Sequence, residues 1–165
     1  MADIKRHILT VQVDNEAGVL ARVVGLFSAR GYNIESLTVA ETDAAQHTSR
    51  ITIVTSGTPA VVEQIEAQLR RLVPVHGVVN WTSAKGGIER EMALVKLDGG
   101  KRDAALKAAE PFKARALETG GKTLVFEIMD APGQIDAFIA AMRPLGLLDV
   151  SRTGVAAISR DADAV

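Results

Sequence analysis

Residues 8–27 read ILTVQVDNEAGVLARVVGLF, and this stretch decides the fold. Apolar and polar residues alternate in its first part, so that Leu9, Val11 and Val13 share one face of an extended chain, as in a half-buried strand. Residues 14–18, DNEAG, are typical of a turn. Apolar residues then recur at helical spacing to the end of the stretch. The stretch therefore predicts a strand, a tight turn and an amphipathic helix.

The elements that follow complete a recognisable order. Gly31 directly follows the helical repeat, where the end of a helix favours a residue with left-handed backbone angles. Alternation and turn residues predict strands at 33–41 and 48–55, a helix that begins at Pro59, and a last strand at 75–81. The order β-α-β-β-α-β is typical of a ferredoxin-like unit, in which both helices cover one face of a four-stranded antiparallel sheet.

The second half of the chain repeats this order. We expect strands at 92–97, 114–118, 123–129 and 147–152, and helices at 103–112 and 131–142. The fold class is therefore α+β, with two ferredoxin-like βαββαβ units: a first domain at 1–83, a linker at 84–88, a second domain at 89–160 and a tail at 161–165. Each unit is small for an independent core and exposes a partly apolar sheet face. We expect pairing, either between the halves or between two chains.

Composition excludes several classes of function. The chain has 19 basic and 20 acidic residues without a basic block, so nothing in it is suited to a nucleic-acid backbone. It has no cysteine, which excludes disulfides and thiolate chemistry. No apolar stretch approaches the roughly 18 residues that span a bilayer, and the N-terminus lacks the pattern of a signal peptide. We expect a soluble, cytoplasmic protein with no membrane or nucleic-acid partner.

Catalytic motifs are also missing from the sequence. His7, His47 and His76 stand alone, without the spacing of metal ligands on a helix, and we expect them to be solvated. Residues 121–123, GKT, imitate the end of a phosphate-binding loop, but Ala116 occupies the position of the required first glycine. We interpret this segment, together with Gly120 before it, as a hairpin turn. A pair of catalytic carboxylates assembled by the fold stays open, although no pair stands out.

The turn before the first helix is the strongest candidate site. Backbone N–H groups at the start of a helix are unpaired and attract a carboxylate. Gly18 lets a ligand approach the backbone, and the Asn15 amide both donates and accepts, which suits a zwitterion. The negative charges of the flanking acids Asp14 and Glu16 would oppose its carboxylate but favour its ammonium group. The residues of the turn alone favour an ordinary helix start, in which Asn15 caps the helix and Gly18 eases the turn.

Several segments resemble the small regulatory subunit of acetolactate (acetohydroxyacid) synthase, an ACT-domain family. They are 6–11 (RHILTV), 15–23 (NEAGVLARV), 25–28 (GLFS), 31–39 (GYNIESLTV) and 49–53 (SRITI). The resemblance is strong over about residues 6–55 and looser afterwards, where 89–96 (EREMALVK) and 152–155 (RTGV) continue it.

The resemblance implies an N-terminal ACT domain, a second ACT-like domain and a homodimer formed through the ACT domains. It implies a chain without catalytic residues that activates a catalytic large subunit of branched-chain amino-acid biosynthesis. Valine, or a related branched-chain amino acid, then binds at the dimer interface and causes feedback inhibition. The matching ligand-binding positions are Asn15, Ala17, Gly18 and Val19 from one chain, with Asn33 and Ile34 from the other.

The resemblance assigns the cofactors thiamine diphosphate, Mg²⁺ and FAD to the catalytic partner, and none to this chain. Two alternatives stay open from the sequence. An ACT-domain sensor could serve a different biosynthetic enzyme or a transcription circuit, and a ferredoxin-like scaffold could carry a free-standing enzyme.

Overall fold

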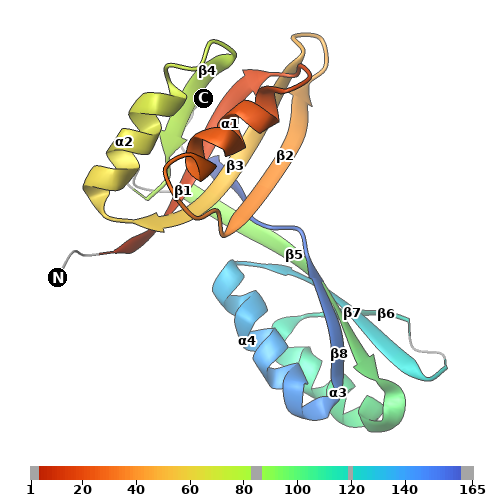
Figure 1. Ribbon diagram of the computed structural model, residues 1–165. Helices are drawn as coiled ribbons and strands as arrows, with labels where there is room; N and C mark the ends of the chain where they lie inside the picture. Colours follow the sequence, from red (N-terminus) through yellow and green to blue (C-terminus); the bar gives the residue numbers. More distant parts are fainter. Residues whose placement is uncertain (1–3, 83–86, 119–120, 161–165) are drawn as a thin grey trace. The chain divides into compact units, whose positions relative to one another are not determined.

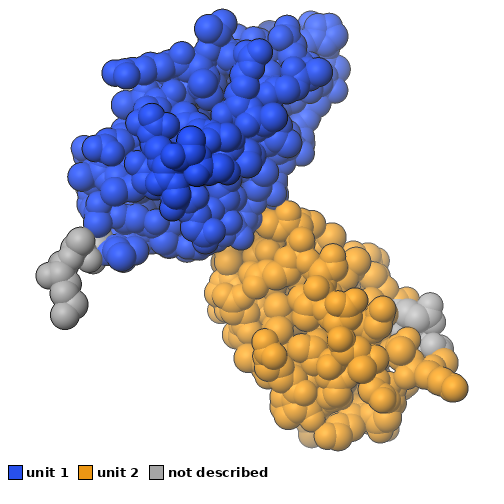
Figure 2. Space-filling model, in the orientation of Figure 1, with its two compact units in different colours: residues 1–88, 155–165 blue, residues 89–154 orange. Residues whose placement is uncertain are grey.

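The computed structural model describes residues 4–82, 87–118 and 121–160. The chain divides into two compact units, distinguished by colour in Figure 2: unit 1 comprises residues 1–88 and 155–165, and unit 2 comprises residues 89–154. Each unit contains an antiparallel sheet and two α-helices, which confirms the predicted α+β class and the ferredoxin-like order. Within the described residues, no helix is both long and apolar enough to cross a membrane.

Unit 1 has the predicted β-α-β-β-α-β order. Its elements are β1 (Lys5–Asp14), α1 (Val19–Ser28), β2 (Ser36–Asp43), β3 (Thr48–Gly57), α2 (Pro59–Leu69) and β4 (Val75–Asn80). The strand order is β2-β3-β1-β4, and both helices lie on one face of the sheet (Figure 1). Strand β2 is therefore an edge strand, and its hydrogen-bonded neighbour in this sheet is β3.

The core of unit 1 lies between the sheet and the two helices. Its largest buried side chains are Leu9, Ile51 and Ile53 from the sheet with Phe27, Ile65 and Leu69 from the helical side. The predicted stripe of α1 is confirmed at Val19 and Val23, but Leu20 is 40% exposed. Gly31 follows the helix with φ of 67°, as the sequence predicts. The exposed Leu20 leaves an apolar position on the outer side of α1.

Unit 2 repeats the arrangement with its own core. Its elements are β5 (Gly87–Asp98), α3 (Arg102–Ala109), β6 (Arg115–Glu118), β7 (Thr123–Asp130), α4 (Pro132–Met142) and β8 (Leu147–Arg152), with short 3₁₀ turns at Gly99–Lys101, Glu110–Phe112 and Arg143–Leu145. The strand order is β6-β7-β5-β8. Phe138 of α4 packs edge-on against Phe112 and Phe126, with ring centroids 5.3 and 5.8 Å away. Strands β6 and β8 are the edges of this sheet.

A short last strand, β9 (Ala156–Ser159), was not predicted; it pairs with β5. Val155 and Ala157 pack with Ile8, Val54 and Trp81 in a small cluster on the helix-free face of the first sheet. The sequence assigned residues up to 160 to the second domain, whereas the structure groups the described residues 155–160 with unit 1. Burial of these apolar side chains against the first sheet explains the difference.

His7 corrects another expectation, since its side chain is only 5% exposed rather than solvated. It lies on β1 directly opposite Thr55 of β3, on the same sheet face as Leu9. Neither ring nitrogen has a hydrogen-bond partner among the described residues. Three predicted features fall wholly or partly outside the described residues: positions 84–86 of the linker, Gly120 of the hairpin turn, and the tail at 161–165.

Candidate functional site

The turn between β1 and α1 begins the helix without a side-chain cap. Gly18 is the N-cap residue of α1, with a left-handed φ of 85°, and no side chain caps the helix. Asn15 instead donates its Nδ2 amide to Oε1 of Glu41 at 3.1 Å, and its backbone N–H to the carbonyl of His47 at 2.6 Å. The Asn15 side chain is therefore held toward the end of β2, and the simple helix-cap interpretation of this residue is wrong.

The start of α1 has unused hydrogen-bond donors. The backbone N–H of Val19 bonds to the carbonyl of Glu16 at 3.3 Å, whereas those of Leu20 and Ala21 have no partner in the part of the chain that the structure describes. A Cβ atom built on Gly18 would meet nothing within 4 Å. Open N–H groups at the positive end of a helix dipole form a ready site for a carboxylate.

Acidic side chains lie around the turn, and two of them already make a hydrogen bond or an ion pair within the chain. Asp14 Oδ1 lies 2.6 Å from Nε2 of His76, and Glu41 accepts from Asn15. With a carboxylate bonded to Asn15 and open N–H groups at the start of α1, the turn has groups that suit an ammonium group as well as an anion. The sequence did not single out Glu41, because it lies 26 positions from Asn15 and only the β2–β3 hairpin brings the two together.

The corner between α1 and β2 is the second part of the predicted site. The Tyr32 backbone N–H bonds to the carbonyl of Phe27 at 3.0 Å, and the two rings meet edge-on with centroids 6.4 Å apart. The Asn33 carbonyl accepts from Thr55 Oγ1 at 2.6 Å, while its exposed side-chain amide has no partner among the described residues. Ile34 is half-buried and packs against the core. The corner thus presents one uncommitted amide on a fixed backbone.

The six predicted ligand-binding positions do not form one cluster within a chain. The turn precedes α1 and the corner follows it, and a helix of 10 residues is about 15 Å long. Asn15, Ala17 and Gly18 are exposed in the turn. Val19 is 4% exposed with its side chain in the core, so it can offer a ligand only its backbone. A single chain therefore presents two predicted half-sites, the turn and the corner, at opposite ends of α1.

Comparison with known proteins covers both units. The family model described as AHAS small subunit-like ACT domain matches residues 9–77, and that described as the small subunit of acetolactate synthase matches residues 90–161. The acetolactate synthase isozyme 3 small subunit of Escherichia coli (strain K12) is 42% identical over 158 residues, which cover 94% of this chain and 96% of that protein. The chain belongs to the acetolactate synthase small-subunit family.

Other members of the acetolactate synthase small-subunit family agree over nearly the whole chain. The small subunit from Aquifex aeolicus (strain VF5) is 37% identical over 161 residues, covering 96% of this chain and 83% of that protein. A crystal structure of the small subunit from Thermotoga maritima superposes with a TM-score of 0.84 at 31% identity, covering 94% of this chain and 98% of that one. The two-unit architecture is therefore that of the small-subunit family, and the first unit is its ACT domain.

Proposed function

We propose that this chain is the regulatory subunit of an acetolactate synthase, which activates the catalytic large subunit and confers feedback inhibition by valine. Valine, or a related branched-chain amino acid, binds where two ACT domains meet. The observation that carries the proposal is the open start of α1 at Gly18, beside an Asn15 side chain that does not cap the helix. Membership in the small-subunit family supports the identity of the partner.

The edge strand β2 supports a site shared between two chains. Unpaired edge strands readily pair with another chain, and β2 also exposes Val39, at 45%. In an isologous antiparallel pair, the Ser36 end of one β2 lies opposite the Asp43 end of the other. The first end continues from the Asn33 corner, and the second lies near Glu41, which holds Asn15. Such pairing joins the two half-sites and covers exposed apolar side chains.

The chemistry of the joined site matches a small amino acid. The open N–H groups at the start of α1 bind its carboxylate, while Glu41 and the carbonyl oxygen of the Asn15 amide bind its ammonium group. The partner's corner adds the free Asn33 amide. Burial of a valine-sized side chain contributes about 1.5–3 kcal/mol. Discrimination from leucine or isoleucine is modest, because one methylene changes binding by only about 1–3 kcal/mol.

Regulation follows from a difference in effector affinity between two states of the complex. In this proposal the catalytic subunit holds thiamine diphosphate, Mg²⁺ and FAD, and the present chain acts through binding alone. A coupling free energy of about 1–3 kcal/mol between effector and catalytic subunit changes either affinity roughly 5–150-fold. The coupling is reciprocal, so the catalytic subunit weakens valine binding by the same factor.

Two measurements test the proposal. Calorimetric titration of the chain with valine, leucine and isoleucine measures effector binding. An acetolactate assay of a purified catalytic subunit, with and without the chain and valine, measures activation and inhibition. We expect valine binding, stimulation of the catalytic subunit and loss of stimulation with valine. Valine binding without any stimulation would instead identify an ACT-domain sensor of a different enzyme, and absence of binding by the folded chain would contradict the sensor role.

A further inference from the structure

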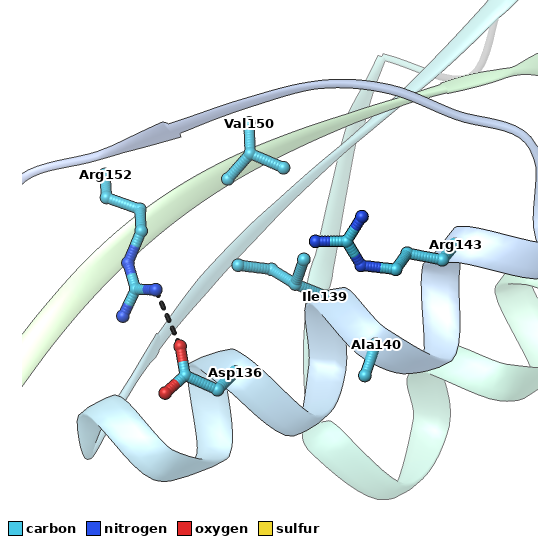
Figure 3. Close-up of a pocket in the computed structure, with 6 residues that line it drawn as sticks. All are labelled: Asp136, Ile139, Ala140, Arg143, Val150 and Arg152. Carbon is cyan, nitrogen blue, oxygen red and sulfur yellow. Dashed lines mark hydrogen bonds and ion pairs between the residues drawn. The ribbon is translucent and has the colours of Figure 1, made fainter.

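A groove in unit 2 lies outside the effector site. It opens between α4 and β8, has a volume of about 470 Å³, and is lined by Asp136, Ile139, Ala140, Arg143, Val150 and Arg152 (Figure 3). Strand β8 is an edge of its sheet, with β5 as its hydrogen-bonded neighbour. Leu148 of the same strand is 58% exposed. A helix beside an open strand edge is a surface to which another chain can add.

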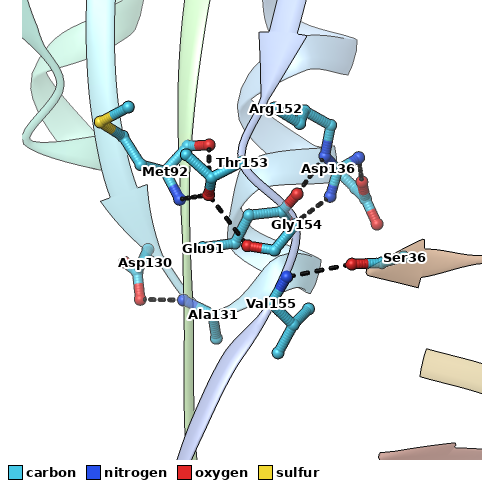
Figure 4. A network of polar contacts seen from close by, with 10 residues as sticks. All are labelled: Ser36, Glu91, Met92, Asp130, Ala131, Asp136, Arg152, Thr153, Gly154 and Val155. Atoms are coloured by element: carbon cyan, nitrogen blue, oxygen red, sulfur yellow. Dashed lines mark hydrogen bonds and ion pairs between the residues drawn. The ribbon is translucent and has the colours of Figure 1, made fainter. Parts of the chain in front are cut away.

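One end of the groove carries a net negative charge. Arg152 donates from Nε and Nη2 to the two carboxylate oxygens of buried Glu91, at 2.8 and 2.6 Å, and from Nη1 to Asp136 at 2.6 Å (Figure 4). The hydrogen bonds to Glu91 raise the pKa of Arg152 above its usual range. One positive and two negative charges sum to −1. The 63% exposed Asp136 side chain carries that excess at the surface.

The other end of the groove carries a positive charge. Arg143 extends its guanidinium into the groove, and it makes no hydrogen bond or ion pair among the described residues (Figure 3). It lies 7 positions after Asp136, two helical turns or about 10 Å along the same face. Between the two lie Ile139, the small side chain of Ala140, and Val150 on β8. The groove is therefore acidic at one end, apolar in the middle and basic at the other end.

We propose that a second copy of this chain occupies this groove, with the two α4 helices antiparallel about a twofold axis beside Ala140. In that arrangement each Asp136 faces the partner's Arg143, because the two charges are equidistant from the middle of the helix face. The small Ala140 lets the helices approach closely, and the apolar centres cover each other. A free anion gains less, because the positive and negative charges along the groove balance.

This interface is distinct from pairing through β2 and does not depend on effector binding. It uses residues of unit 2 alone, so unit 2 contributes its own self-association surface. If the chain fails to bind valine, the proposed unit 2 interface is not contradicted. If the unit 2 interface is not found, the proposed effector site is not contradicted.

Single-cysteine cross-linking in the full chain tests the proposal, because the natural sequence contains no cysteine. Ala140→Cys places a thiol near the proposed axis, and Lys107→Cys on the exposed side of α3 is the matched control. Any association through unit 1 would raise the local concentration equally in both variants. We expect Ala140→Cys to form a disulfide-linked dimer about 100-fold faster, as thiols held together at an interface react at millimolar effective concentration.

A charge test separates specific pairing from random collision. In the Ala140→Cys background, Arg143→Glu should slow cross-linking at least to the rate of the control, whereas Arg143→Lys should retain most of it. If Ala140→Cys does not fold by circular dichroism, Ala137→Cys, one turn earlier on the exposed side of α4, with a short bis-maleimide replaces it. Equal rates at positions 140 and 107, or rates that Arg143→Glu leaves unchanged, would overturn the proposal.

Discussion

Thr38 donates its hydroxyl to the carbonyl oxygen of Val155 across 2.8 Å, which joins residues 117 positions apart. Two positions earlier on the same strand, Ser36 Oγ accepts the Val155 backbone N–H at 3.1 Å (Figure 4). Both backbone polar groups of Val155 are thus satisfied by side chains of β2. These two hydrogen bonds hold Val155 against β2, the strand that follows the Asn33 corner.

The first prediction concerns this attachment. Val155→Ala should lower the free energy of unfolding of unit 1 by about 2 kcal/mol, because two buried methyl groups are lost from contact with Ile8 and Val54. Ile158→Ala is the control, since Ile158 is 56% exposed and its loss should change stability by less than about 0.5 kcal/mol. Trp81 is the only tryptophan and lies in the same cluster, so its fluorescence in a urea titration reports on this unit.

The second prediction concerns a buried polar pair in that cluster. Trp81 donates its indole N–H to Thr10 Oγ1 at 2.7 Å, and both residues are buried. Thr10→Val leaves the indole N–H without its partner and should cost about 1–3 kcal/mol. In a double-mutant cycle with Trp81→Phe, followed by circular dichroism, the paired change should cost less than the sum of the single changes. Strict additivity would show that the hydrogen bond contributes nothing.

The third prediction separates backbone strain from ligand repulsion at Gly18. Asn and Asp tolerate left-handed backbone angles better than other non-glycine residues and have nearly the same size. Gly18→Asn and Gly18→Asp should therefore fold with similar stability. Only Gly18→Asp should weaken valine binding about tenfold or more relative to Gly18→Asn, because like charges at contact distance near a protein surface repel by about 1–4 kcal/mol. Equal affinities would place the effector carboxylate elsewhere.

The fourth prediction concerns the ion pair in unit 2. Arg152→Met leaves the carboxylate of Glu91, 5% exposed, without its guanidinium, and should cost about 3 kcal/mol. Glu91→Gln keeps the shape of the side chain and should cost less, since Arg152 still pairs with Asp136. Asp136→Asn removes a largely exposed partner and should change stability least. Urea denaturation monitored by circular dichroism gives this order, and a reversed order would contradict it.

Local patterns in the sequence predicted most of the fold. The alternation of Leu9, Val11 and Val13 predicts β1, and Gly31 has the left-handed backbone angle expected after a helix. Strand β9 was missed because four residues carry no periodic pattern, and the residues that hold Val155 lie far away in the sequence. His7 was misjudged because a position at the start of a strand does not reveal which neighbours cover it.

The sequence alone predicted only part of the candidate site. The open start of α1 follows from Gly18 and the general chemistry of helix ends, but Asn15 is more typical of a helix cap than of a ligand contact until its bond to Glu41 is known. Asn33 was predicted as a ligand-binding residue only because of the family resemblance. In one chain it lies beyond the far end of α1, and no local pattern indicates that a second chain could bring it to the turn.

Complementation in mixed dimers tests the shared site most directly. Asn15→Ala and Asn33→Ala chains, carrying different tags, are prepared separately and as a purified mixed dimer, and valine binding is measured by calorimetry. Each variant alone should bind weakly. In the mixed dimer, the unchanged turn of one chain meets the unchanged corner of the other, so one site of parental affinity should return. A mixed dimer that binds as weakly as either variant would contradict a site built from two chains.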